Sequence, residues 1–241
     1  MKRNERHHLK ENELVQLASR TRDAIDARQR EIGAVAIAVI LVAVAAIGYY
    51  AWRSRVEGRA GSMLADAVIL SEARVGPPPA PGTPATGPSF PTEREKYEAT
   101  AAKFKAVADE YPSSDAGVFA RYREGSTQMA LGNTKEAAAA YQQVIDRAGS
   151  GLYGQMARLG LAEVQAREGQ YDIAISTYKG LADNKDGPLP VDGILMQLGR
   201  TYLEAGKATE AQQTFNRVVE EFPESPFSGD ARKQLESLKK S

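Results

Sequence analysis

The amino-acid sequence predicts an all-α protein in which a single N-terminal transmembrane helix is followed by a solenoid of helical hairpins. Three observations lead to this fold class: an uncharged apolar run at 32–52, a Pro/Gly-rich segment at 76–91, and a 37-residue period in the remainder of the chain. At 241 residues the chain has room for one sizeable domain with appendages. We therefore expect one repeat domain rather than several independent domains.

The apolar run reads IGAVAIAVILVAVAAIGYYAW and extends over 21 uncharged residues, from Ile32 to Trp52. As a helix it would rise about 31 Å, which matches the thickness of a hydrocarbon core. A cleaved signal peptide is the alternative, but its apolar region usually has about 7–15 residues behind a short basic start. Here 31 residues precede a longer run. Tyr49, Tyr50 and Trp52 fall where aromatic side chains meet the membrane interface, so we predict an uncleaved anchor.

Positive charges flank the span on both sides and favour a cytoplasmic N-terminus by one residue. Residues 1–31 form a polar tail with apolar residues at helical spacing, so we expect a cytoplasmic amphipathic helix there. The predicted location is a bacterial inner membrane, with a single pass and a periplasmic repeat domain. The flanking arginines are Arg20, Arg22, Arg28 and Arg30 before the span and Arg53, Arg55 and Arg59 after it.

Two segments connect the span to the repeats. Residues 53–75 carry apolar residues at helical spacing and are predicted to form the first helix of a degenerate repeat. Residues 76–91 hold seven prolines and three glycines, which excludes a helix and favours an extended loop. Thr92 stands where a helix N-cap is expected. We interpret the loop as an insertion between the two helices of the first hairpin.

Residues 92–225 repeat with a period of 37 residues in several columns at once. A fixed period of this length indicates stacked supersecondary units. The remaining residues, 226–241, restart the helical pattern and are predicted to cap the last unit. The columns are Phe104, Tyr141, Tyr178 and Phe215; Thr100, Ala137, Ala174 and Ala211; Val107, Val144, Leu181 and Val218; and Gly132, Gly169 and Gly206.

Each column has a physical role in a helix–turn–helix unit. The glycines end the first helix, because a left-handed residue lets the chain reverse. The small residue five positions later lets the second helix lie close to the first, and the aromatic residue four positions beyond it fills the space between neighbouring units. Pro112 and Pro223 are expected to stop second helices.

The composition bears on chemistry. Lys plus Arg and Asp plus Glu both number 31, so no basic excess predicts nucleic-acid binding. The chain has no cysteine, and its only histidines are His7 and His8 in the polar tail. We therefore predict no catalytic, metal-binding or cofactor-binding residues, and no small-molecule substrate. An enzyme that depends on carboxylates is the alternative of another class, but the acidic residues are scattered over polar helix faces.

The segments LGNTKEAAAAY, EGQYDIAISTY and AGKATEAQQTF resemble the turn and second helix of the tetratricopeptide repeat, whose usual period is about 34 residues. The layout of a short helix, one span and repeats resembles the bacterial family of the ancillary subunit of the SecYEG translocon. The last repeat is also similar to those of the cell division coordinator and of the lipoprotein subunit of outer-membrane protein assembly. The absence of cysteine means that the latter likeness cannot extend to a lipid anchor.

These resemblances imply a membrane-anchored protein–protein interaction module that assists exported or envelope proteins near the Sec translocon, as a chaperone-like helper or scaffold. A scaffold in cell division or outer-membrane assembly without translocon contact is the alternative. The expected partners are other proteins, with translocon or exported envelope proteins suspected, and the membrane through residues 32–52.

In a tetratricopeptide array the first helices of successive units line a concave groove. Flexible methionine side chains suit a groove that accepts varied apolar segments, and Arg167 and Arg200 could engage a carboxylate. The residues that the repeat alignment places toward this groove are Phe119, Tyr122, Met129, Met156, Leu159, Glu163, Arg167, Met196, Arg200 and Glu204.

Overall fold

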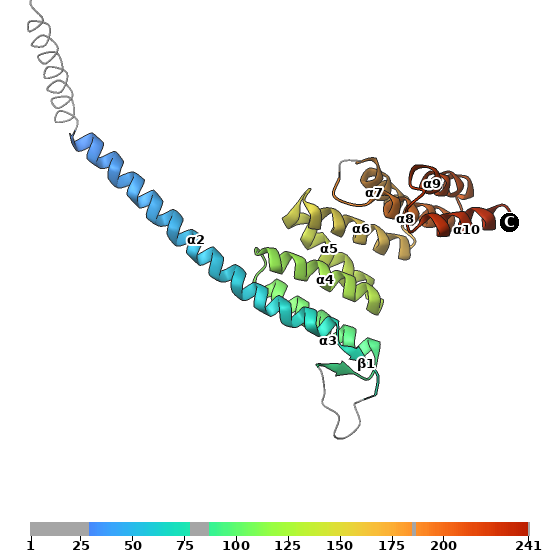
Figure 1. Ribbon diagram of the computed structural model, residues 1–241, viewed down its shortest axis with the longest axis horizontal. Coiled ribbons are helices and arrows are strands. Elements are labelled where there is room, and N and C mark those ends of the chain that lie inside the picture. Colours follow the sequence, from blue (N-terminus) through green and yellow to red (C-terminus); the bar gives the residue numbers. More distant parts are fainter. Residues whose placement is uncertain (1–28, 78–86, 185–186, 241) are drawn as a thin grey trace, which may run out of the picture. The chain divides into compact units, whose positions relative to one another are not determined.

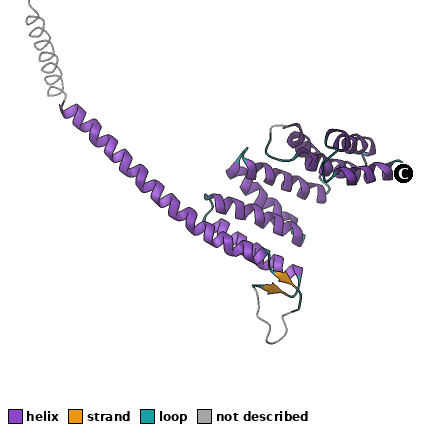
Figure 2. Cartoon of the chain, in the orientation of Figure 1, coloured by secondary structure: helices purple, strands orange, loops and turns teal. Residues whose placement is uncertain are grey.

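The computed structural model describes residues 29–77, 87–184 and 187–240. These residues form nine helices and two short strands, in the order α2, β1, β2 and then α3 to α10 (Figures 1 and 2). The predicted all-α class, with an apolar helix ahead of helical hairpins, is confirmed. The chain divides into two compact units, Met1–Arg55 and Val56–Ser241. The amphipathic helix expected near the N-terminus lies outside the described residues except at its end.

Helix α2 extends from Gln29 to Ser71 and contains the predicted span. Apolar side chains on this part of the helix are open to their surroundings, since Val42 and Ile47 are each 70% exposed and Tyr50 is 77% exposed. Among the described residues, α2 is the one helix long and apolar enough to cross a membrane. It continues past Trp52 to Ser71 without a new start, because no proline interrupts it there.

The end of α2 differs from the prediction. Residues 72–75 were expected to be helical, but the helix ends at Ser71 and Arg74–Val75 form strand β1. This strand pairs in parallel with β2, Ser89–Phe90, and the Gly76 N–H donates to the Phe90 carbonyl at 2.9 Å. The sequence GPPP begins at once, and a helix cannot continue into consecutive prolines. The strand pair therefore closes the ends of the Pro/Gly-rich insertion.

The hairpins follow this insertion as antiparallel helix pairs. Thr92 is the N-cap of the first of these helices, as predicted, and its hydroxyl accepts from the Glu95 N–H at 3.2 Å. The helices are α3 (Glu93–Glu110), α4 (Asp115–Leu131), α5 (Thr134–Ala148), α6 (Leu152–Arg167), α7 (Tyr171–Asp183), α8 (Val191–Glu204), α9 (Ala208–Glu221) and α10 (Ser228–Leu238).

The repeated glycines make the tight turns inside three hairpins. Gly132, Gly169 and Gly206 have φ values of 82°, 77° and 72°, which confirms the predicted left-handed conformation. After each glycine the next N–H reaches back to a carbonyl five residues earlier; the Asn133 N–H, for example, donates to Gln128 at 2.9 Å. The second helix of each hairpin then begins within two residues.

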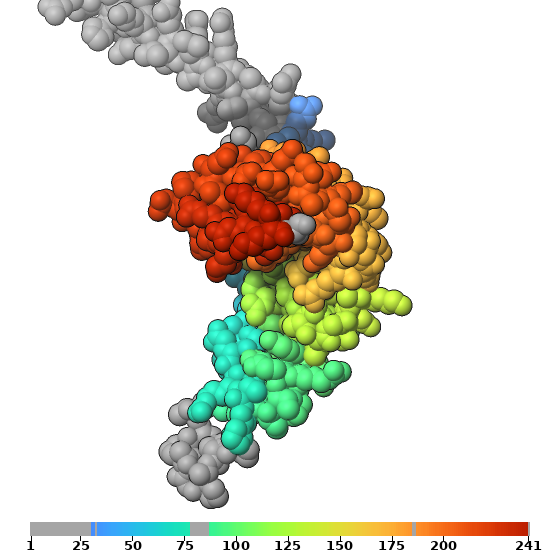
Figure 3. Space-filling view, turned by 90° about the vertical axis from the view of Figure 1, so that its right-hand side faces the viewer, coloured from blue at the N-terminus to red at the C-terminus, as the bar shows by residue number. Residues whose placement is uncertain are grey.

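The columns of the 37-residue period form the core. Ala137, Ala174 and Ala211 are fully buried, and Phe104 and Phe215 are equally inaccessible beneath neighbouring helices. In the first hairpin, Ala67 from α2 packs against Phe104, Val107 and Ala120. At the other end α10 lies on α9, and Figure 3 shows it in red at the surface of the molecule.

Candidate protein-binding face

The first helices of successive hairpins lie next to one another. Helix α4 contacts α6, and α6 contacts α8, in addition to the contacts that each makes with its own second helix (Figure 1). One continuous surface is thus built from α4, α6 and α8. We call it the first-helix face and define it by its accessible residues, which are Phe119, Tyr122, Tyr153, Met156, Leu159, Glu163, Arg167, Arg200 and Glu204.

Aromatic side chains form the part of this face nearest the helix N-termini. The rings of Phe119 on α4 and Tyr153 on α6 are 5.6 Å apart, and those of Tyr122 and Tyr141 are 5.9 Å apart. Phe119, Tyr122 and Tyr153 are half-buried. Tilted aromatic pairs at such distances stabilise one another beyond their burial and keep the rings in place. Met156 is also half-buried and adds a flexible apolar side chain.

Charged side chains occupy the later turns of the same helices. Arg167 forms an ion pair with Glu163 at 3.0 Å and donates to the Met129 carbonyl of α4 at 3.3 Å. On α8, Arg200 is half-buried and Glu204 is exposed. Of the two arginines singled out in the sequence, Arg167 is thus already engaged within the molecule, whereas no ion pair of Arg200 is found among the described residues.

Two of the predicted groove residues lie in the core instead. Met129 is 5% exposed and packs with Tyr141 and Val164, while Met196 is 1% exposed and belongs to the C-terminal core. Leu159 is partly buried against that same core. Helical position alone did not reveal that these side chains turn toward the second helices, because a position near the edge of a helix face can point either way.

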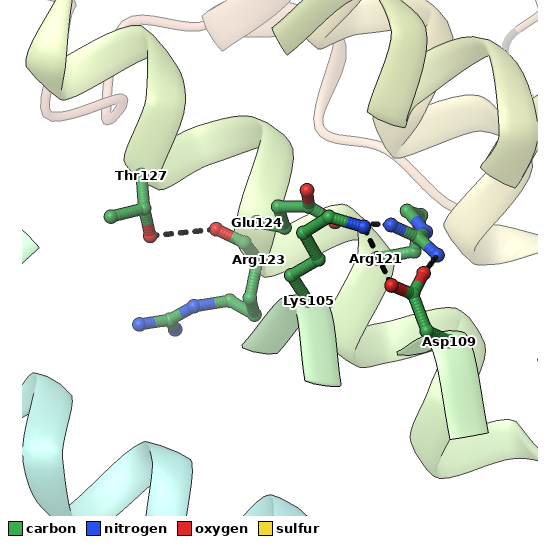
Figure 4. A network of polar contacts seen from close by, with 6 residues as sticks. All are labelled: Lys105, Asp109, Arg121, Arg123, Glu124 and Thr127. Carbon is green, nitrogen blue, oxygen red and sulfur yellow. Dashed lines mark hydrogen bonds and ion pairs between the residues drawn. The ribbon is translucent and has the colours of Figure 1, made fainter. Parts of the chain in front are cut away.

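Sequence reasoning missed a polar network between α3 and α4. The Arg121 guanidinium donates to Glu124 at 2.5 Å and to Asp109, which also accepts from Lys105 at 2.6 Å (Figure 4). Glu124 is buried. The 37-residue period contained a signal for this network. Two periods after Arg121 and Glu124, the same two columns hold Leu195 and Leu198, which indicates that these columns are core positions.

The ionisable groups of this network have pKa values that are shifted in different directions. Burial raises the pKa of the Glu124 carboxyl, and the attraction of Arg121 offsets this only in part. Hydrogen bonds from Lys105 and then Arg121 lower the pKa of the more exposed Asp109. Burial acts to lower the pKa of Arg121, but its two carboxylate partners outweigh burial and raise it. Glu124 is therefore the member of the network whose charged form is disfavoured by burial.

Two tyrosines of the aromatic column, Tyr141 and Tyr178, are buried beneath the face. The Tyr141 hydroxyl donates to the Ser126 hydroxyl at 3.2 Å, and burial raises the pKa of Tyr141 to about 12. Burial likewise raises the pKa of Tyr178 well above its usual range. Both side chains are therefore neutral packing residues at physiological pH, and the surface they support carries its charge on Glu163, Arg167, Arg200 and Glu204.

This arrangement defines the class of the protein: a helical-hairpin solenoid that presents an aromatic and charged face, suited to binding another protein. In the part of the chain that the structure describes, no group of three or more His, Asp or Glu residues could hold a metal ion. The model of the tetratricopeptide repeat-like domain family matches residues 30–240. The chain belongs to this family, and the match includes the apolar helix as well as the hairpins.

The chain is also similar to proteins of known structure. TPR-like repeats from Podosopora anserina are similar over 75% of this chain and 84% of theirs, with 14% identity and a TM-score of 0.57. A tetratricopeptide repeat protein from Parabacteroides merdae is 16% identical over 61% of this chain, which spans about half (55%) of that protein, with a TM-score of 0.48. At such identities the likeness concerns the fold. No curated protein sequence matches the chain significantly.

Proposed function

We propose that this protein is a membrane-anchored tetratricopeptide module that binds exported or envelope proteins in the periplasm, beside the Sec translocon. Residues 32–52 anchor it with the N-terminus in the cytoplasm. The first-helix face binds the partner. The protein acts as a chaperone-like helper or scaffold and carries out no chemistry of its own.

The combination of two surfaces carries this proposal. The span presents large apolar side chains outward, such as Val42 at 70% exposure, and lipid is the environment that would cover them. The first-helix face combines half-buried aromatic rings with a charged border, which is the composition of protein-binding surfaces. A tetratricopeptide fold provides the rigid helices that keep this face in shape.

The first test concerns the side of the membrane. A C-terminal tag should be digested by protease added to intact spheroplasts, while a cytoplasmic marker protein stays protected. A tag that survives until the membrane is lysed would place the repeats in the cytoplasm and refute a periplasmic function.

The second test concerns the partner. A photo-crosslinking amino acid at Tyr122 or Met156 should yield adducts that contain translocon subunits or exported chains, identified by mass spectrometry. The matched control carries the same probe at Gln212, an exposed residue on α9 away from the first-helix face, and should give none of these adducts. Adducts with division or outer-membrane assembly proteins in place of translocon components would contradict the translocon role but keep the binding function.

A further inference from the structure

Arg123 on α4 is placed differently from its neighbour Arg121. Its guanidinium lies over the Phe104 ring at 5.3 Å and over the Phe119 ring at 6.0 Å. In Figure 4 the Arg123 side chain points away from the network that holds Arg121. Within the described residues this half-buried guanidinium has no carboxylate or other side-chain acceptor.

A guanidinium between two rings is preorganised. Stacking on aromatic faces holds its plane, and it leaves the N–H edge free to donate. One part of the group is already shielded from water by Phe104 and Phe119, so an acceptor at the free edge would gain more than it would at a fully solvated arginine. The remaining N–H donors of the Arg123 guanidinium are complementary to an acceptor with two oxygens in one plane, which is the geometry of a carboxylate.

The surroundings of Arg123 indicate what would carry that carboxylate. Phe119 packs against Tyr153 of α6, with ring centroids 5.6 Å apart. An aromatic surface therefore extends from Arg123 onto α6. A partly exposed pair of rings binds apolar or aromatic side chains. A single guanidinium beside such rings, in a chain with zero net charge, is a poor site for the closely spaced phosphates of nucleic acid.

We propose that Arg123, Phe119 and Tyr153 form a receptor for an acidic side chain flanked by aromatic residues in a partner protein. The carboxylate of the partner accepts from Arg123, and its adjacent ring packs on Phe119 and Tyr153. This assignment rests on the proposed binding function of the first-helix face and specifies the chemistry of its partner.

The test compares two fluorescent peptides that differ only in charge, GGFDFDFGG and GGFNFNFGG, for binding to the full-length protein in zwitterionic nanodiscs. Fluorescence anisotropy should show the acidic peptide binding at least about tenfold more tightly than the amide peptide at low salt, a typical effect of one charge-assisted hydrogen bond. Equal binding of the two peptides, or tighter binding of the amide peptide, would overturn the proposal.

Variants locate the contact. Arg123→Gln should bring the acidic peptide down to the affinity of the amide peptide, and Arg123→Lys should recover only part of the difference because lysine lacks the planar fork. Arg158→Gln is the matched control, since Arg158 is another half-buried arginine on α6 and lies outside the first-helix face. If Arg158→Gln abolished the preference and Arg123→Gln did not, the receptor would be assigned wrongly.

Two further measurements distinguish a wrong receptor assignment from an unfolded variant and from a failure of the proposed binding function. Thermal unfolding of Arg123→Gln shows whether the domain still folds, and the wild-type peptide comparison remains decisive if it does not. Photo-crosslinking at Tyr122 reports the proposed binding function independently. Adducts at Tyr122 together with equal peptide affinities would refute the acidic receptor alone.

Discussion

The junction between α3 and α4 and the junction between α7 and α8 occupy equivalent places in the repeat, two periods apart, yet they are built from different chemistry. At the first, Arg121 and Glu124 form a half-buried ion pair that extends to Asp109 and Lys105. At the second, Leu195 and Leu198 stand in the same two columns and lie in a continuous apolar core.

The difference shows what the repeat requires and what it leaves free. Both junctions keep the aromatic column and the small-residue column buried, with Phe104 and Thr100 on α3 and Tyr178 and Ala174 on α7. The two columns at the junction itself accept either an ion pair or two leucines. A buried ion pair seldom stabilises more than an apolar pair of similar volume, because both charges lose water. We therefore expect the α3–α4 junction to be the weaker one.

The largest effect should come from breaking the ion pair on one side only. Arg121→Met would leave Glu124 buried without its cation, and the free energy of unfolding should fall by about 3–5 kcal/mol. The measurement is urea unfolding of the full-length protein in detergent, followed by near-ultraviolet circular dichroism.

The double substitution Arg121→Leu/Glu124→Leu is the matched control, since it copies the apolar junction of Leu195 and Leu198. It should restore wild-type stability or exceed it. A double variant as unstable as Arg121→Met would mean that the network stabilises the first junction in a way that apolar packing cannot replace.

The contact between α8 and α9, which adjoins the apolar junction, should be sensitive to shape. A Cβ added at Gly199 of α8 would come within 2.5 Å of the Phe215 ring, which is fully buried and cannot move aside easily. Gly199→Ala should therefore destabilise the domain by about 1–3 kcal/mol. Gly180→Ala is the control, because Gly180 lies inside α7 with open space around its Cα; that change should be neutral or stabilise by up to about 1 kcal/mol.

Most of the fold, but not all of it, could be predicted from the sequence. The glycine, alanine and aromatic columns predicted the hairpins, the left-handed turns and the core, because each position has one physical task that recurs every 37 residues. The apolar helix was predictable because composition and length alone indicate it. The strand pair Arg74–Val75 and Ser89–Phe90 was not, since two-residue strands have no periodicity.

The candidate site was less predictable than the fold. Position in the repeat selected Phe119, Tyr122 and Met156 on the accessible surface, but it also selected Met129 and Met196, which lie in the core. The Arg123 stack depends on Phe104 from another helix, and the pairing of Arg121 with Asp109 spans two helices as well. Contacts between helices fix both features, and spacing within one helix does not report them.

A smaller effect is expected where the aromatic column carries a hydroxyl. Tyr141→Phe removes the bond to Ser126 and should cost about 1 kcal/mol at neutral pH, while the ring keeps its place, as Phe104 and Phe215 do in equivalent positions.

The pH dependence tests the same residue. Burial raises the pKa of Tyr141 from 10.0 to about 12, so the folded state holds the proton more tightly than the unfolded state. Its contribution is complete below pH 10 and is lost as the pH rises toward 12, by an amount on the order of 3 kcal/mol. The stability of Tyr141→Phe should fall less steeply between pH 9 and pH 11, and parallel curves would contradict the assignment of this titration to Tyr141.

The smallest effect should come from the exposed edge of the polar network. Asp109 is 50% exposed and pairs with Lys105 and Arg121, so solvent screens its interactions, and Asp109→Asn should cost at most about 1 kcal/mol at pH 7. Since its pKa is lowered from 3.8 in the folded state, this contribution is present above pH 3.8 and is lost as the pH falls through the folded value.

Glu124 behaves in the opposite sense: its raised pKa means that its ionisation weakens the fold as the pH rises above 4.5. Unfolding at pH 7 and pH 3 should therefore show Asp109→Asn converging with the wild type at low pH, whereas Glu124→Gln should gain on it as the pH rises. If Glu124→Gln instead lost stability relative to the wild type as the pH rose, as Asp109→Asn does, ionised Glu124 would stabilise the fold, and the junction would not be divided into an exposed and a buried half.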